Sequence, residues 1–138
     1  MQFAVDSAAP ELEAEAFVRG EGRRTVALSA FRGSWIVVAL GASHSDVVEL
    51  ARLEEAFAAD GAVVLAATPA AAGVVEVRYT DEPVRFPILG GVVEEQALTV
   101  IVDPDGIVRY VGERQSARET LAVLEDLLFA PYDLSLAA

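Results

Sequence analysis

The chain of 138 residues contains no cysteine. This absence excludes a disulfide framework and zinc sites built on cysteine. It also excludes every reaction that runs through a protein thiolate, because no other natural side chain matches that nucleophile near neutral pH. A cysteine-free protein suits any redox compartment, so the absence says little about where the protein works.

Basic residues are also scarce. The chain has 10 Lys+Arg against 22 Asp+Glu, a formal net charge of -12 and a pI near 4.3. Such a field repels phosphate backbones and anionic membrane surfaces, so we expect neither a nucleic-acid nor a membrane partner. Solubility is the simplest explanation of the acidity. A basic protein partner is the alternative.

Long apolar runs and a targeting segment are missing as well. No stretch approaches the roughly 20 uncharged apolar residues that a membrane helix needs. The apolar run over 35–42 is too short and is typical of a buried strand. The N-terminus has no basic region followed by an apolar run, which predicts no secretory signal and a cytoplasmic location.

Length and composition predict one globular domain. The hydrophobic fraction of 54% argues against disorder. A chain of this size buries roughly two-thirds of its unfolded surface on folding, so its core needs no disulfide or metal to stabilise it. We therefore expect a single domain over 1–138, with an N-terminal extension over 1–8 and an apolar tail over 130–138 that carries Leu134 and Leu136.

Hydrophobic periodicity predicts the order of the elements. Alternation and glycine turns predict an N-terminal hairpin. Continuous β-branched runs predict buried strands, and Asp103 to Gly106 has the chemistry of a hairpin turn. The expected strands cover 13–18, 25–28, 35–40, 62–67, 98–102 and 107–111, with a short extended piece within 84–89. Two β-α-β crossovers and a final hairpin favour a mixed sheet with helices on both faces.

Capping signals predict where the helices begin. A helical turn is expected over 29–33, and a helix from about 46 to 60 with Asp46 and Glu49 as its capping box. A short helix follows from Pro69 to about Tyr79. Ser116 and Glu119 open the last helix, which the sequence ends at Ala130-Pro131.

Four blocks of the sequence carry a family resemblance. They are Ala9 to Leu12, Gly22 to Val38, Phe86 to Leu89, and Thr99 to Arg109. In this order they resemble the Ala-Pro-Asp-Phe opening, the Gly-x-x-Val-x-Leu-Ser-x-Phe-Arg-Gly-Lys block, the Phe-Pro-Leu-Leu segment and the Thr-Phe-Ile-Ile-Asp-Pro-Asp-Gly-x-Val-Arg hairpin of peroxiredoxins of the alkyl hydroperoxide reductase/thiol-specific antioxidant family. The resemblance spans about 9–128. It implies a thioredoxin-like (redoxin) fold, a three-layer α/β/α sandwich with a central mixed sheet and an N-terminal β-hairpin.

The departures from the family fall where its chemistry lies. The family needs Pro, Thr or Ser, and Cys in the loop after the first core strand, and thioredoxin-like relatives carry Cys-x-x-Cys there. Ser45 and Val48 stand where that pair would be. Ala97 matches the family arginine, and Leu98 stands where thioredoxins have a cis-proline. The degenerate redox-site positions are therefore Ala42, Ser43, His44, Ser45, Val48, Ala97 and Thr99, and we expect no catalytic residue, cofactor or metal.

Other constellations are weaker. His44, Ser45 and Asp46 have the residue types of a hydrolytic triad, but three consecutive residues cannot place the base between nucleophile and acid. A single histidine with unplaced carboxylates is poor ligation for a transition metal. Asp103 and Asp105 belong to a turn and lack the spaced ligands of a calcium loop.

The sequence thus predicts a cysteine-less, non-catalytic thioredoxin-fold protein that acts by protein binding or self-assembly. A homodimer or another protein partner is expected, with the apolar tail over 128–136 as the docking element. Two alternatives stay open. One is an enzyme with residual or repurposed activity around Ser45, His44 and Thr99. The other is a small-ligand module in the old redox cleft, where Ala42 and Ala97 leave apolar space.

Overall fold

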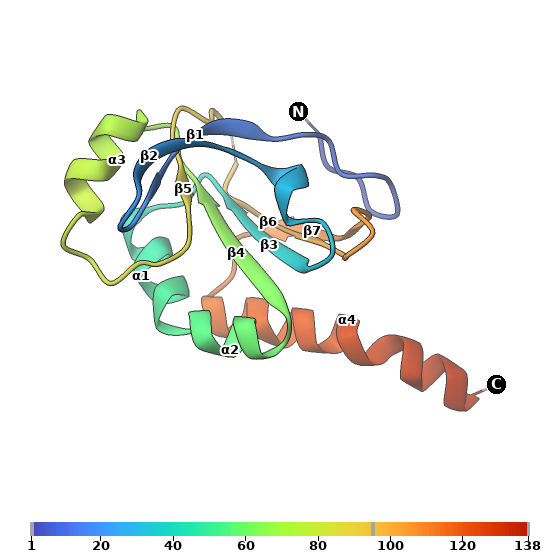
Figure 1. Cartoon of the computed structure of the whole chain (residues 1–138). Helices are drawn as coiled ribbons and strands as arrows, with labels where there is room; N and C mark the ends of the chain where they lie inside the picture. The colour runs from blue at the N-terminus through green and yellow to red at the C-terminus, as the bar shows by residue number, and fades with distance from the viewer. Residues whose placement is uncertain (1, 95, 138) are drawn as a thin grey trace.

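The computed structural model describes residues 2–94 and 96–137, with side chains up to residue 129. Within these residues, one mixed sheet has the strand order β2-β1-β5-β4-β3-β6-β7 (Figure 1). Its strands are β1 (Glu13–Val18), β2 (Gly22–Ala27), β3 (Trp35–Leu40), β4 (Ala62–Ala67), β5 (Ile88–Leu89), β6 (Leu98–Val102) and β7 (Val108–Glu113). The helices are the 3₁₀ turn η1 (Leu28–Phe31), α1 (His44–Arg52), α2 (Glu54–Ala59), α3 (Ala72–Tyr79) and α4 (Ala117–Ala137).

The centre of the sheet is formed by the most apolar strands. β3 lies parallel to β4 and antiparallel to β6, with Val38 opposite both Leu65 and Val100. All three side chains are fully buried. Both faces of these strands are covered, which is why their sequences are apolar runs without alternation.

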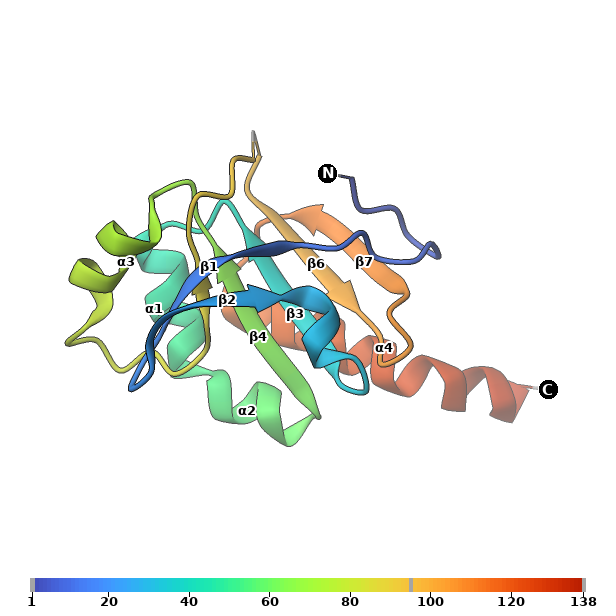
Figure 2. The same cartoon turned by 45° about the horizontal axis from the view of Figure 1, so that its top comes forward.

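The N-terminal hairpin belongs to this same sheet. β1 pairs with β2 on one side and with β5 on the other, where Ala16 lies opposite Leu89. The turn between β1 and β2 places Gly20 at φ 84° and Gly22 at φ 78°, a region that favours glycine. Figure 2 shows the hairpin crossing over the central strands.

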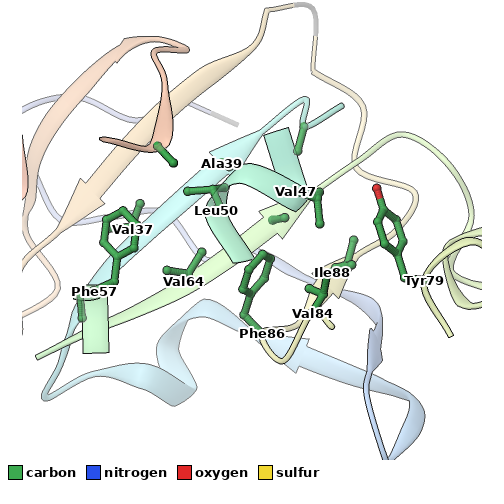
Figure 3. Packing of buried hydrophobic residues seen from close by; sticks show 14 of the residues in the cluster. Val37, Ala39, Val47, Leu50, Phe57, Val64, Tyr79, Val84, Phe86 and Ile88 are labelled. Carbon is green, nitrogen blue, oxygen red and sulfur yellow. The ribbon is translucent and has the colours of Figure 1, made fainter. Parts of the chain in front are cut away.

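Two clusters of buried side chains form the core, one on each face of the sheet. All four α-helices contribute to the first, through Val47, Leu50, Phe57, Val75, Tyr79, Ala117 and Leu124 (Figure 3). The second is covered by the hairpin, by η1 and by the N-terminal segment that carries Phe3. The fold class is thus confirmed, while the layer over the second face is built from strand, 3₁₀ turn and extended chain where the sequence predicts a helix.

The helix expected over 46–60 is two helices. Leu53, with φ -108° and ψ 7°, separates α1 from α2. The break leaves Val47, Leu50 and Phe57 buried on the same core cluster. The expected apolar face is therefore present. Its side chains meet the sheet from two short helices, since the backbone departs from helical angles between them.

α3 begins later than the sequence indicates. Its first residue is Ala72 and its N-cap is Ala71, so Pro69 lies in the connection before it. Backbone bonds within this region go to the loop after β5, where the Gly91 N–H donates to Ala70 O at 2.8 Å and the Val92 N–H donates to Thr68 O at 3.0 Å. These long-range bonds hold the chain in an extended path and delay the helix.

α4 does not stop at Pro131 and runs to Ala137. Proline removes one backbone hydrogen bond, but its fixed φ of about -65° is compatible with a helix, so it weakens this helix without ending it. Ser116 caps the first turn, accepting the Glu119 N–H at 3.1 Å. The far end of α4 extends beyond the body of the domain (Figure 1). Over the described residues, no helix combines the length and apolar character that a bilayer crossing requires.

The turn between β6 and β7 is organised by one buried carboxylate. Asp103, 6% exposed, accepts the N–H groups of Asp105 at 2.9 Å and Ile107 at 3.0 Å. It also accepts Nε–H of Arg109 at 2.8 Å, and that arginine reaches Asp6 at 3.0 Å. Burial acts to raise the pKa of Asp103, but the hydrogen bonds from Ile107, Arg109 and Asp105 outweigh it and hold the pKa below its usual value.

The core cluster predicts a large effect of truncating Phe57. Phe57→Ala removes a fully buried ring and should lower the free energy of unfolding by about 3–5 kcal/mol. Val77→Ala on α3 is the control, since Val77 is 83% exposed and its truncation should change that free energy by less than about 0.5 kcal/mol. Urea unfolding measures both. Equal losses in the two variants would contradict the core assignment.

The lowered pKa of Asp103 predicts how the free energy of unfolding changes at acidic pH. Its folded pKa is depressed, so its contribution is complete above the unfolded value of about 4 and is lost as the pH falls through the folded pKa. Asp103→Asn should lower stability at pH 7 and flatten the decline below about pH 4. Thermal unfolding between neutral and acidic pH tests this. Asp105→Asn, an exposed neighbour in the same turn, should leave the profile unchanged.

Candidate functional site

The degenerate redox-site positions meet at one end of the central strands. Leu40, the last residue of β3, lies opposite Leu98, the first residue of β6. Gly41 follows with φ 64°, and a Cβ there would lie 3.2 Å from Gln96 O and 3.3 Å from the Ala97 Cα. The loop after β3 therefore lies directly against the segment before β6, and both this close approach and the positive φ favour glycine.

The loop after β3 ends in a capping box formed by Ser43 and Asp46. This is three residues earlier than the capping box of Asp46 and Glu49 that the sequence predicts. The Ser43 Oγ accepts the Asp46 N–H at 3.2 Å, and the Asp46 carboxylate accepts the Ser43 N–H at 3.0 Å. Helix α1 thus begins at His44, with Asp46 in its first turn. Serine and aspartate are both favourable N-cap residues, so the sequence alone does not distinguish Ser43 from Asp46. The reciprocal bonds between them identify Ser43 as the N-cap and Asp46 as the third residue of the helix.

The remaining positions lie around this helix start. Ala42 is buried in the first core cluster, whereas His44 and Ser45 are exposed in the first turn of α1. Val48 is half-buried one turn further on. Ala97 is exposed before β6, and Thr99 inside β6 is 2% exposed.

Arg114 is the central residue of the site, and sequence reasoning missed it. It directly follows β7, and its side chain is only 10% exposed. Its Nη1 donates to Asp46 Oδ2 at 2.7 Å. Its Nη2 donates to the carbonyl oxygens of Leu98, at 2.7 Å, and of Leu40. One guanidinium thereby joins the ends of β3, β6 and β7 to the start of α1.

Charge and burial oppose each other at Arg114. Burial acts to lower its pKa and gives the net direction, while the Asp46 carboxylate acts to raise it. A guanidinium remains charged even so, because its ordinary pKa lies far above neutral pH. The burial of this charge is therefore offset by the ion pair to Asp46 and by the two carbonyl groups.

Glu49 joins α1 to α4. Its Oε1 accepts the N–H of Ala117, the first residue of α4. The carboxylate expected to cap α1 thus lies near the N-terminus of another helix, where a negative charge is favourable.

Little space remains between these groups. A cavity of about 10 Å³ lies beneath Arg114, lined by Asp46, Glu49, Thr99, Gln115 and Thr120 together with apolar neighbours. Outside it is a surface hollow of about 340 Å³ lined by Gln96, Ala97, Glu113 and Arg114. Arg114 lies against both spaces. The apolar cavity expected beside Ala42 and Ala97 is not what the structure has there, because Ala42 packs in the core and Ala97 borders an open surface hollow.

The three side chains that resemble a triad point to different partners. The His44 ring stacks on Tyr79, with ring centroids 5.4 Å apart and planes at 27°. The Ser45 Oγ lies 3.2 Å from the Ser43 Oγ, and Asp46 pairs with Arg114. Among the residues the structure describes, no three histidine, cysteine, aspartate or glutamate side chains gather closely enough to hold a metal ion.

Solved structures show the same architecture, although no model of a protein family and no characterised protein sequence matches the chain. The mitochondrial 2-Cys peroxiredoxin of Plasmodium falciparum superposes with a TM-score of 0.82 at 13% identity, covering 94% of this chain and 96% of that one. The reduced 2-Cys peroxiredoxin of Plasmodium vivax gives 0.80 at 16% identity, covering 93% and 98%. Thioredoxin peroxidase I of Plasmodium yoelii gives 0.81 at 14% identity, covering 94% and 93%.

The architecture is therefore a thioredoxin-like fold. Its particular form, with the N-terminal hairpin added to the sheet, is that of the peroxiredoxins. The chain has no cysteine, so the peroxidatic reaction that depends on a cysteine thiolate cannot take place in it. In this chain the Arg114 side chain lies at the loop after β3, where it bonds to Leu40 and Asp46.

Removing the guanidinium should destabilise the whole site. Arg114→Met keeps the length of the side chain but leaves Asp46 and two carbonyl groups without their donor, so we expect a loss of about 2–3 kcal/mol in the free energy of unfolding. Urea unfolding measures it, and Arg118→Met, an exposed arginine on α4, is the matched control.

A double-mutant cycle with Asp46→Asn should give a coupling energy above about 1 kcal/mol, because the two charges share one buried contact. Additive effects, or an Arg114→Met variant as stable as Arg118→Met, would show that the ion pair does not organise the site.

Proposed function

We propose that the chain is a non-catalytic thioredoxin-fold protein that works by self-assembly, with the outer part of α4 as its contact surface. The observation that carries the proposal is the course of α4, which packs on the core through Leu121, Leu124 and Leu128 and continues to Ala137. Phe129, the next residue, is a large apolar side chain that is 60% exposed. A cytoplasmic location and a role without nucleic acid or membrane remain predictions from the composition.

The inner part of α4 anchors it to the domain. Leu124 is fully buried, and Leu121, Val123, Leu127 and Leu128 pack against the same cluster. Beyond them the helix continues for roughly 13 Å at 1.5 Å per residue. Extending a helix that is already formed needs no new nucleus and adds one hydrogen bond per residue. A partner surface that buries Phe129 would stabilise this extension further.

Charge favours a second copy of the chain at this place. Two molecules of net charge -12 repel each other over most of their surfaces. The stretch 129–138 contains a single charged residue, Asp133, so the repulsion is weakest there. A closed pair of identical surfaces, each contributing the end of α4, is the commonest symmetry for such an assembly.

The two alternatives have less support. A ligand in the old redox cleft would have about 10 Å³ beside Arg114 and Thr99, the room of one water molecule, and outside it the open surface hollow of about 340 Å³ beside Ala97. A repurposed enzyme would need Ser45, His44 and Thr99 to converge on a substrate. Ser45 and His44 lie on the surface, and Thr99 lies inside the sheet.

Phe129→Glu tests the assembly. Placing a carboxylate in the contact should weaken dimerisation at least about tenfold, a loss of about 1.4 kcal/mol or more. Val77→Glu on α3 makes the same change in net charge on an exposed valine and should leave the dimerisation constant within about threefold of the wild type. Light scattering after size-exclusion chromatography, over a range of protein concentrations, measures both.

A wild-type chain that stays monomeric throughout this range would contradict self-assembly. Equal weakening by both glutamates would show that total charge governs association and that α4 has no special part. Capture of a basic protein at low salt but not at high salt, by the monomeric wild type, would favour the alternative partner.

A further inference from the structure

Two polar atoms inside the site make no hydrogen bond to any described protein atom. They are the Oγ1 of Thr99 and the Nε of Arg114, and both are buried. Thr99 as a residue is 2% exposed, and the Arg114 side chain is 10% exposed. A buried polar group without a partner loses its hydrogen bond to water and gains none in return, so two of them in one place require an explanation.

Both residues line the same cavity. Its volume is about 10 Å³, and the carboxylate-bearing residues Asp46 and Glu49 also lie on its wall. A space of this order is what one water molecule needs, provided that two to four polar groups surround it. The cavity meets both conditions. It lies on the face of the sheet that α1 and α4 cover, because Thr99 is two residues from Ile101 on β6, and so points to the same face as this member of the first core cluster.

The hydrogen-bonding groups that line the cavity determine which kind of molecule fits inside it. The Arg114 Nε–H can only donate, so the occupant must accept a hydrogen bond. Asp46 and Glu49 can only accept when ionised, so it must also donate, and the Thr99 hydroxyl serves in either role. A small anion accepts but does not donate and would lie beside two carboxylates, while a metal cation cannot accept and would lie beside a guanidinium. Water satisfies every group.

We propose that one ordered water molecule is bound in this cavity, accepting the Nε–H of Arg114 and hydrogen-bonded to Oγ1 of Thr99. The other guanidinium contacts are already made, with Nη1 on Asp46 and Nη2 on the carbonyl groups of Leu40 and Leu98. The water therefore completes the set of partners of a buried charge. It is a structural ligand shared by β6 and the residue that follows β7, and it is independent of the proposed self-assembly.

The test compares Thr99→Val with Thr99→Ser in the full chain. Valine keeps the shape of threonine without its hydroxyl, and serine keeps the hydroxyl. In the wild type we expect an electron-density peak within hydrogen-bond distance of both Arg114 Nε and residue 99. Oxygen-17 relaxation dispersion counts long-lived internal waters, and Thr99→Val should show one fewer than the wild type. Thr99→Ser should show the same number as the wild type.

The Nε–Hε resonance of Arg114 provides a second readout. It should shift in Thr99→Val and remain close to its wild-type position in Thr99→Ser, in both cases while the circular dichroism of the fold is unchanged. The proposal is overturned if wild-type crystals show Thr99 bonded to a main-chain carbonyl with no solvent peak beside it. It is also overturned if the peak refines as an ion with metal-like contact distances, or if Thr99→Val keeps the same number of internal waters.

Discussion

The buried guanidinium of Arg114 is the interaction on which the rest of this site depends. A charge taken out of water must find partners, and here it finds the Asp46 carboxylate and two strand-end carbonyl groups. Arginine suits this position because it keeps its charge when buried, whereas lysine loses its proton more readily. The sequence uses arginine at every basic position. A fold that this chain shares with the matched peroxiredoxins thereby contains a network of polar contacts around Arg114, in a chain that has no thiol.

The missing thiol connects the fold to the proposed role. A chain without cysteine carries out no chemistry through a protein thiolate, and the cavity beside Arg114 and Thr99 has a volume of only about 10 Å³. The net charge of -12 opposes the close approach of two copies of the chain. The outer part of α4 combines low charge with apolar residues, and it extends away from the domain (Figure 1). Recognition through this helix is therefore consistent with both the missing chemistry and the charge.

Much of the fold follows from local patterns, and much of the site does not. The strands of the central sheet were predictable because Val37, Val38 and Val100 belong to uninterrupted apolar runs, and the β6–β7 turn because Pro104 and Gly106 match its angles. The position of Arg114 was not predictable, since a charged residue at the end of an edge strand ordinarily faces solvent. Its partner Asp46 lies 68 residues away in the chain, and no local pattern marks such a pair.

The errors in the helices have the same origin. Ser43 and Asp46 are both good N-caps, and only the reciprocal bond between them, seen in three dimensions, identifies the first. The break at Leu53 and the delay of α3 reflect packing and long-range backbone bonds that propensity does not contain. Pro131 is a strong stop signal in sequence, yet α4 continues past it.

The attachment of α4 along its inner part has a mechanical consequence. Core contacts from Leu121 to Leu128 fix the helix over residues 117–128, so only the stretch 129–137, about 13 Å at 1.5 Å per residue, acts as a lever. A tilt of about 10° at Leu128 carries the far end through about 2 Å, less than half of one helical turn. The direction of the far end therefore follows the packing of Leu124 and Leu128 on the core.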